Sequence, residues 1–327
     1  MSRAAVTTFA AIHGHDRICT FLRTAVGNGR LAHALLFAGP EGIGKRSVAL
    51  AFAAWVHCSA GGSDACGGCA SCRQIAAGSH PDVHLVAVAA GKKEIGIDRV
   101  RELKRLMRLQ PMLGTTKVAI IDEAPLLTMA AQNALLKMLE EPPDHSLLIL
   151  VASSPDALLP TVRSRCQRLQ FAPLPTETVA SIVAGVAGIE APVARELALL
   201  AEGSPGRALT LGRALVGAAR AQLVEALAGL RGARYVELAH MAHELNHPEA
   251  DAGVKLEALL AQYRDDAVRA IGAPQLAVHP PSPATPVSSS VLLRRADAVY
   301  DAWSATRRGN PNRQLLFEAL LLRLARL

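Results

Sequence analysis

Short apolar runs alternate with amphipathic segments through the first half of the chain. Three mainly apolar runs and one segment of alternating apolar and polar positions predict strands: 33–38, 117–123, 146–154 and 82–88. The segments beside them place apolar residues three and four positions apart, as helices do: 12–31, 47–56, 70–78, 98–110 and 129–139. Strands that alternate with helices indicate a parallel sheet with helices on both faces. We therefore expect an α/β domain that ends with a short strand at 168–171, and Asp98 as the N-cap of its helix.

The second half has a different pattern, which is helical from residue 173 onward. Segments 176–188 and 192–202 predict two short helices, and the turn 203–206 leads into a third. Most of the remainder is amphipathic helix, interrupted at 274–290 by a Pro- and Ser-rich segment that we expect to be a loop or disordered. The predicted division is 1–171, 172–212 and 213–327, an α/β domain followed by two helical ones.

The segment Gly39-Pro-Glu-Gly-Ile-Gly-Lys-Arg46 follows the first apolar run and precedes a helical segment. Strand, glycine-rich turn and helix form the setting of a phosphate-binding P-loop. Gly39, Gly42 and Gly44 would let backbone N–H groups turn towards a phosphate, and Lys45 would reach the β- and γ-phosphates. A P-loop needs Ser or Thr after the lysine as a ligand of Mg²⁺, whereas this chain has Arg46. The loop is therefore suited to phosphate and poorly suited to the metal.

The apolar run 117–121 ends in Asp122-Glu123, which is the pattern of a Walker B motif. In that motif the Asp lies near Mg²⁺ and the Glu orients an attacking water. An Asp-Glu pair after an apolar run is common by itself. The P-loop upstream makes a Walker B motif the better interpretation of this pair. Functional residues of parallel sheets gather at the carboxyl ends of strands, and Lys45, Asp122, Glu123 and Ser153 all follow predicted strands. We expect these side chains at one edge of the sheet.

Four of the six cysteines lie close together in the chain, as Cys58, Cys66, Cys69 and Cys72. Two consecutive C-x-x-C steps predict a tight knuckle that presents four thiolates to one Zn²⁺. Four thiolates close the coordination shell and leave no position for a catalytic water, so the predicted role is structural. An iron–sulfur cluster is the main alternative, and a cluster without metal is the other.

Half of the 327 residues are hydrophobic and few are aromatic, which favours helices over strands. We find no signal peptide and no apolar run of the ~20 residues that a membrane span needs, so we expect a soluble, cytoplasmic chain. The net charge of +7 comes mainly from residues 1–171, with 19 Lys and Arg against 13 Asp and Glu. This excess suits contact with phosphates, and ordinary surface charge explains it equally well.

Four basic residues, Arg101, Lys104, Arg105 and Arg108, form one stripe of a predicted helix. The stripe could face nucleic acid or an acidic partner. It is also what the solvated face of an amphipathic helix looks like, and the sequence leaves both interpretations open.

Taken with the preceding motifs, Ser164-Arg165-Cys166 resembles the matching segment of bacterial clamp-loader subunits of the AAA+ superfamily. The resemblance extends to segments 133–142, 203–206 and 312–323, and so spans nearly the whole chain. It implies a AAA+ P-loop domain with a parallel sheet, a helical lid and an all-α collar that joins a hetero-pentamer with gamma/tau motor subunits and a delta subunit. In this family the assembly uses ATP to load a sliding clamp on primer–template DNA during DNA replication.

The resemblance also implies a role for Arg165. In this family Ser-Arg-Cys carries an arginine finger, whose guanidinium reaches the γ-phosphate of ATP held by a neighbouring subunit and stabilises charge in the transition state. Arg165 would then act in trans. The alternative is a loop arginine that is merely paired with a carboxylate.

Two departures separate the chain from subunits that hydrolyse ATP. Arg46 replaces the metal-binding hydroxyl, and Gly206 stands where motor subunits carry a sensor arginine, with Arg207 one residue later and ~100° around the helix. The resemblance therefore points to the delta-prime type of subunit that accompanies DNA polymerase III, a stator without ATPase activity of its own and with doubtful binding of ATP or ADP. An active AAA+ motor ATPase and a zinc-dependent DNA-binding protein remain as alternatives.

Overall fold

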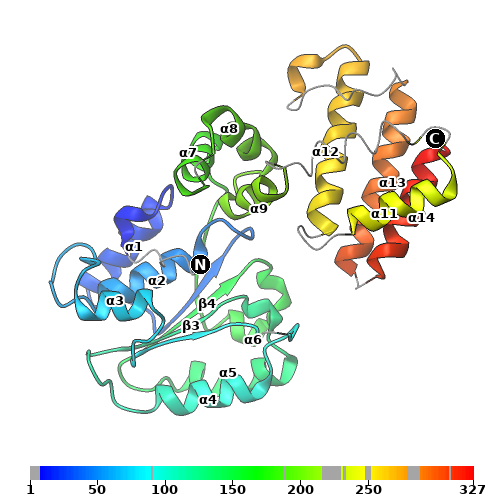
Figure 1. Cartoon of the computed structure of the whole chain (residues 1–327). Helices are drawn as coiled ribbons and strands as arrows, with labels where there is room; N and C mark the ends of the chain where they lie inside the picture. Colours follow the sequence, from blue (N-terminus) through cyan, green and yellow to red (C-terminus); the bar gives the residue numbers. More distant parts are fainter. Residues whose placement is uncertain are drawn as a thin grey trace. The chain divides into compact units, whose positions relative to one another are not determined.

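The structure, a computed structural model (Figure 1), describes residues 8–89, 91–187, 189–215, 230, 233–246, 252–277, 288–308 and 311–327. The chain divides into two compact units, Met1–Thr178 with Gly203–Gly206, and Val179–Glu202 with Arg207–Leu327. None of the described helices is both long and apolar enough to cross a membrane.

The first unit contains a five-stranded parallel sheet with the strand order β2-β3-β4-β1-β5. Its strands are β1 (Ala34–Ala38), β2 (Val83–Val86), β3 (Lys117–Ile121), β4 (Ser146–Ala152) and β5 (Gln167–Gln170). β1 lies between β4 and β5, so that Leu36 pairs with Leu150 on one side and with Arg168 on the other. The predicted α/β fold with a parallel sheet is thus confirmed, and the carboxyl ends of all five strands share one edge.

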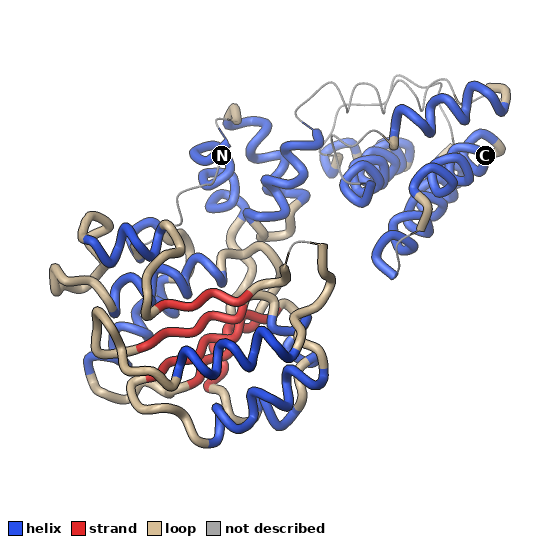
Figure 2. The backbone as a smooth tube through the Cα atoms, turned by 60° about the horizontal axis from the view of Figure 1, so that its bottom comes forward, coloured by secondary structure: helices blue, strands red, loops and turns tan. Residues whose placement is uncertain are grey.

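Helices cover both faces of this sheet (Figures 1 and 2). One face carries η1 (Phe9–Ala11), α1 (Asp16–Gly27), α2 (Lys45–Val56) and α3 (Ala70–Ala76). The other carries α4 (Ile97–Met107), α5 (Met129–Glu140) and α6 (Pro160–Arg163). Two further 3₁₀ turns, η2 (Ala124–Leu126) and η3 (Pro155–Ala157), follow β3 and β4.

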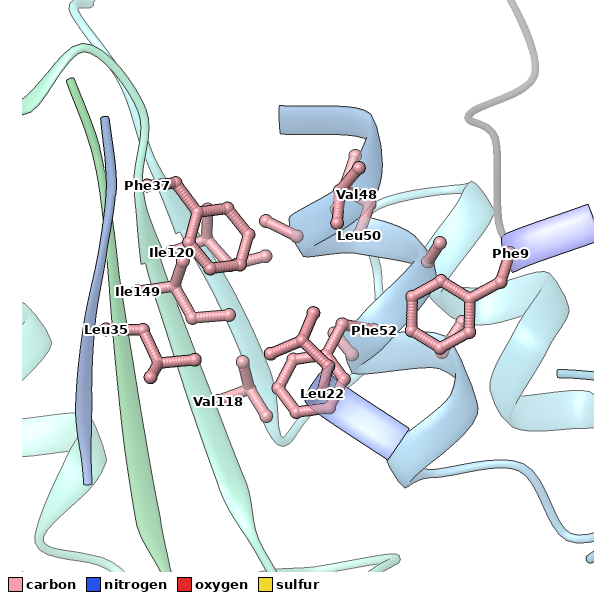
Figure 3. Packing of buried hydrophobic residues seen from close by; sticks show 14 of the residues in the cluster. Phe9, Leu22, Leu35, Phe37, Val48, Leu50, Phe52, Val118, Ile120 and Ile149 are labelled. Carbon is pink, nitrogen blue, oxygen red and sulfur yellow. The ribbon is translucent and has the colours of Figure 1, made fainter. Parts of the chain in front are cut away.

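Side chains of each strand alternate between two separate cores, because successive Cβ atoms point to opposite faces. Leu35 and Phe37 of β1 pack with Val48 and Phe52 of α2 in the first core (Figure 3), whereas Leu36 belongs to the second. Every residue of β1 is buried, as expected for the inner strand of a sheet that is covered on both faces.

The N-terminus of α4 differs from the expectation. Gly96, with extended backbone, is the N-cap residue, and Asp98 lies in the first turn, where its carboxylate accepts a hydrogen bond from Arg101 at 3.3 Å. The prediction of Asp98 as N-cap is therefore wrong by two residues. A Gly N-cap has no side chain to mark it, whereas an Asp in the first turn is favoured by the helix dipole.

The remaining described segments are helical: α7 (Thr176–Ala187), α8 (Ala191–Leu200), α9 (Pro205–Leu215), α11 (Tyr235–Leu245), α12 (Ala252–Ala270), η4 (Pro274–Leu276), α13 (Ser289–Arg308) and α14 (Arg313–Ala325). A third core, which includes Leu256, Phe317 and Leu321, is shared by the four helices α11, α12, α13 and α14. Most of the predicted loop at 274–290 lies outside the described residues, although η4 and the start of α13 fall within its limits. The division at residues 171 and 212 stays a prediction.

A buried ion pair fastens β2 to β3. The carboxylate of Asp82 is fully buried and accepts hydrogen bonds from the N–H groups of Met112 (2.8 Å) and Leu113 (2.7 Å) and from Lys117 Nζ (3.2 Å). Burial alone would raise the pKa of this carboxyl, but the two backbone donors and Lys117 outweigh it and lower the pKa to about 2.

We expect Asp82 to make the protein sensitive to acid. Its folded-state pKa lies below the unfolded value, so its contribution of about 2 kcal/mol is present above the unfolded pKa and lost as pH falls towards 2. Asp82→Asn should lower the free energy of unfolding by about 3–5 kcal/mol at pH 7, because it leaves the Lys117 ammonium buried without a counter-charge. Urea unfolding between pH 2 and pH 7 measures both effects.

The control is Asp98→Asn, which removes a carboxylate that is 90% exposed. It should change the free energy of unfolding by less than about 0.5 kcal/mol. Equal urea midpoints for Asp82→Asn and the parent at pH 7 would contradict the prediction.

Candidate functional site

The predicted P-loop connects β1 to α2, and its glycines adopt the conformations that the turn needs. Gly39, Gly42 and Gly44 have φ values of +153°, +72° and +102°, which L-residues rarely adopt. A Cβ at Gly39 would lie 2.4 Å from the carbonyl oxygen of Phe171. The loop also meets the end of β4, because Gly39 N donates to Ala152 O at 3.2 Å. The backbone is therefore that of a phosphate-binding turn at the carboxyl edge of the sheet.

Lys45 is folded back onto its own loop. Its Nζ donates to the carbonyl oxygens of Gly39 (2.6 Å) and Pro40 (2.5 Å), and the residue is only 5% exposed. Burial lowers the pKa of the ammonium, which Glu41 and Asp122 partly counteract. To reach a phosphate, Lys45 would have to leave both carbonyl groups.

The carbonyl groups that follow in the loop are also engaged. Ser204 Oγ donates to Glu41 O at 2.8 Å, and Gly206 N donates to Gly42 O at 2.9 Å. On the opposite side, the buried His15 donates from Nε2 to Ile43 O at 2.7 Å, and burial lowers the pKa of its imidazole. Five consecutive carbonyl oxygens, 39–43, therefore accept hydrogen bonds from the chain itself.

Gly206 leaves no room for a side chain at the position where the sequence lacks the sensor arginine. A Cβ added there would lie 2.8 Å from Gly42 Cα, which is closer than real Cβ contacts come. Arg207, one residue later, pairs instead with Glu202 at 3.1 Å. The sequence indicated that the arginine is missing, but not that the turn 203–206 packs directly on the P-loop. A glycine at this position is the only sequence feature that could have indicated it.

Arg46 pairs with the Walker B carboxylate. Its Nη1 lies 3.0 Å from Asp122 Oδ2, so a guanidinium contacts the carboxylate that a Walker B motif uses for Mg²⁺. The pair is half-exposed and contributes little to stability, but it places a positive charge that opposes a metal ion. Glu123 has a left-handed backbone (φ +54°), and burial together with Asp122 and Glu41 raises the pKa of its carboxyl. Lys45 follows β1, and Asp122 and Glu123 follow β3, so all three lie at the carboxyl edge of the sheet; their role at a nucleotide stays a prediction.

Arg165 lies in the turn after α6. Its Nη2 is 2.9 Å from Glu140 Oε1 at the end of α5, and its Nη1 donates to Thr161 O at 2.9 Å. The side chain remains 37% exposed. No hydrogen bond or ion pair among the described residues joins Arg165 to Lys45, Asp122 or Glu123.

A buried amide holds the segment before Arg165. Gln132 of α5 accepts from Leu159 N at 2.7 Å and donates to Leu127 O (3.2 Å) and Ala157 O (3.4 Å). It therefore joins the segment after the Walker B motif to the start of residues 159–165, which we call the arginine loop. The sequence analysis missed both Gln132 and Glu140, although a glutamine on the buried side of an otherwise apolar helix was a usable indication.

The arginine loop borders an open hollow of about 340 Å³, lined by Leu36, Pro160, Arg163, Ser164 and Arg168. Arg163 pairs with Asp156, and Arg168 donates to Gln170 at 2.8 Å. Both arginines that line the hollow are therefore engaged by other groups of the chain.

The four predicted metal ligands converge in space. The sulfur atoms of Cys58, Cys66, Cys69 and Cys72 all lie within 4.8 Å of one another. Tetrahedral Zn–S bonds of about 2.3 Å place sulfur atoms about 3.8 Å apart, so the set fits a metal of this kind after a small contraction. The cluster can hold a metal ion with four sulfur ligands.

Backbone N–H groups donate to three of the four sulfur atoms in the cluster. Cys66 N donates to Cys58 Sγ (3.2 Å), Cys69 N to Cys66 Sγ (3.2 Å) and Cys72 N to Cys69 Sγ (3.4 Å). The hydrogen bond from Cys72 N is the main reason why the pKa of Cys69 falls to about 5. Burial instead raises the pKa of the Cys72 thiol to about 12. The knuckle is attached to the first core, where Cys72 is fully buried, and Asp64 accepts from Phe9 N at 2.8 Å.

The basic stripe of α4 is partly paired within its own helix. Arg101 contacts Asp98 at 3.3 Å and Arg105 contacts Glu102 at 2.8 Å, and these side chains are mostly exposed. This pairing halves the charge that the stripe offers, and both interpretations of it stay open.

A parallel sheet of order β2-β3-β4-β1-β5, with a P-loop after β1 and Asp-Glu after β3, defines a AAA+ P-loop protein with an altered nucleotide site. A family model described as DNA polymerase III, delta subunit, matches residues 14–175. Over 305 residues the chain is 34% identical to DNA polymerase III subunit delta' of Escherichia coli K12. This match covers 90% of each of the two chains. The chain belongs to the family of DNA polymerase III delta' subunits.

Two further similarities differ in how much of each chain they cover. The delta' subunit of Pseudomonas aeruginosa is 38% identical over 202 residues, and the chain spans 61% of its length in that match. Among solved structures, a DNA polymerase III gamma subunit-related protein of Thermotoga maritima aligns with 94% of this chain and 98% of its own, at 19% identity and a TM-score of 0.48.

Proposed function

We propose that this chain is a stator subunit of a DNA polymerase III clamp loader, which hydrolyses no ATP itself and offers Arg165 to ATP on a neighbouring motor subunit. The observation that carries the proposal is the contrast between two surfaces. The loop carbonyls 39–43 and Asp122 are occupied by the chain's own groups. Arg165, in contrast, stays partly exposed on an ordered loop.

The partners follow from the family. Gamma/tau motor subunits and a delta subunit would complete the hetero-pentamer, and the sliding clamp and primer–template DNA would be met through that complex. The metal at the four cysteines would be a structural Zn²⁺, because four thiolates satisfy its tetrahedral shell.

An active motor ATPase is the second candidate, and Asp122 and Glu123 are the residues that favour it. Three contacts argue against it: the Arg46–Asp122 pair, the Lys45 bonds to its own loop, and the packing of Gly206 on Gly42. A motor would have to break all three before Mg²⁺ and ATP could enter.

The test is ATP binding and hydrolysis by the purified chain, with and without Mg²⁺, beside an Arg46→Thr variant. We expect no turnover from either protein. Arg46→Thr restores the P-loop sequence, but Ser204, Gly206 and Lys45 still close the loop. Phosphate release measures hydrolysis, and titration with a fluorescent ATP analogue measures binding.

Lys45→Ala serves as the control for any binding that is observed, because it removes the P-loop lysine. Mg²⁺-dependent hydrolysis by the parent chain that Lys45→Ala abolishes would overturn the stator proposal in favour of a motor subunit.

A further inference from the structure

The guanidinium of Arg165 uses only part of its hydrogen-bonding capacity within its own chain. Nη2 contacts Glu140 Oε1 at 2.9 Å, whereas Nη1 donates to Thr161 O at 2.9 Å and to Ser164 Oγ at 3.5 Å. A guanidinium carries five N–H donors in a fixed plane, so at least two remain after these contacts. That is enough for a two-point contact with a phosphate while the existing contacts persist.

Glu140 is well placed to act as a fixed support, because the end of α5 is anchored on either side of it. His33 Nε2 donates to Leu139 O at 3.0 Å, and Glu141 N donates to Lys137 O at 3.0 Å. Leu135 and Leu139 of the same helix are buried in the second core. The carboxylate of Glu140 thus extends from a rigid helix end, whereas Arg165 extends from a turn.

From this geometry we infer that Glu140 is a positioning residue for Arg165: it sets the direction of the guanidinium before a neighbouring nucleotide arrives. Contacts at both terminal nitrogens fix the plane of the guanidinium, which the contacts of Nη1 alone with Thr161 and Ser164 do not. This inference rests on the proposed function. Glu140 itself touches neither ATP nor the reacting atoms.

The contribution of Glu140 should depend on the assembly. In the isolated chain both side chains are partly exposed, 37% for Arg165 and 49% for Glu140, so solvent screens the pair. A subunit interface that excludes water strengthens a charge pair and makes misorientation of the arginine more costly. The effect should therefore be seen in ATP hydrolysis by the complex and be small in the stability of the free chain.

The experiment is single-turnover ATP hydrolysis by clamp loaders that are reconstituted with parent, Glu140→Gln, Arg165→Ala or doubly substituted chains. We expect Glu140→Gln to slow the hydrolysis phase that depends on Arg165 by about tenfold, with the apparent affinity for ATP changed less than about twofold. In the Arg165→Ala background, Glu140→Gln should add no further slowing. Glu141→Gln is the matched control, because Glu141 has no side-chain partner among the described residues, and it should match the parent.

The outcomes separate the inference from the proposed function. If Arg165→Ala slows hydrolysis and Glu140→Gln does not, or accelerates it, the positioning role is wrong and the stator proposal stands. Equal slowing by Glu140→Gln with and without Arg165 would mean a structural role and would also overturn the inference. If Arg165→Ala itself has no effect, the proposed function fails. Size-exclusion chromatography of each complex verifies that assembly is intact.

Discussion

Replacing Arg165 by Ala should slow ATP hydrolysis at the neighbouring motor subunit by about 10³-fold or more, because trans-acting arginine fingers contribute rate factors of about 10³–10⁵. The side chain is partly exposed, and its contacts within the chain are an exposed carboxylate, one carbonyl group and one hydroxyl group. Removing it therefore costs the free chain little stability, and the loss should fall almost entirely on the transition state for phosphoryl transfer.

Single-turnover hydrolysis by the reconstituted complex is the measurement, because it resolves the site beside this chain from any other motor site. Arg163→Ala is the matched control. It removes a positive charge two residues away, from a side chain already paired with Asp156, and should leave the rate within about twofold of the parent. An unchanged rate for Arg165→Ala in a fully assembled complex would remove the finger role.

The second large effect concerns the cysteine knuckle. Cys69→Ser should reduce bound metal well below one ion per chain and lower the melting temperature by about 10 °C or more, since structural metal binding contributes several kcal/mol to folding. The pKa of Cys69 is lowered to about 5, and its sulfur accepts the N–H of Cys72 in the first turn of α3. Its loss would release α3 and the attachment of Cys72 to the first core.

Metal analysis and thermal unfolding measure this effect, with Cys166→Ala as the control outside the cluster. Cys166→Ala should leave the metal content unchanged. Iron and visible absorption in the purified protein would support an iron–sulfur cluster in place of zinc. Loss of DNA binding with assembly and melting temperature unchanged would contradict the structural role and favour the zinc-dependent DNA-binding alternative.

Several features of this protein could be predicted from residues that are close together in the sequence. The apolar run 34–38, the glycines after it and the lysine at the start of a helix predicted a strand, a P-loop and α2, because local backbone preferences and burial decide such elements. Two C-x-x-C steps predicted a four-cysteine cluster, because their short spacing limits where the sulfur atoms can lie. The parallel sheet followed from the alternation of strands and helices.

Tertiary structure decided what these elements do to one another. Arg46 and Asp122 are 76 residues apart, and Ser204 and Glu41 are 163 residues apart, yet each pair forms a hydrogen bond. No local pattern indicates that the turn 203–206 closes the P-loop or that Glu140 meets Arg165, because those contacts depend on how distant segments pack. The sequence by itself determined that a P-loop, a Walker B pair, a cysteine knuckle and a loop arginine are present. Only the packing of distant segments decided that the first two are closed by the chain's own groups while the arginine stays accessible.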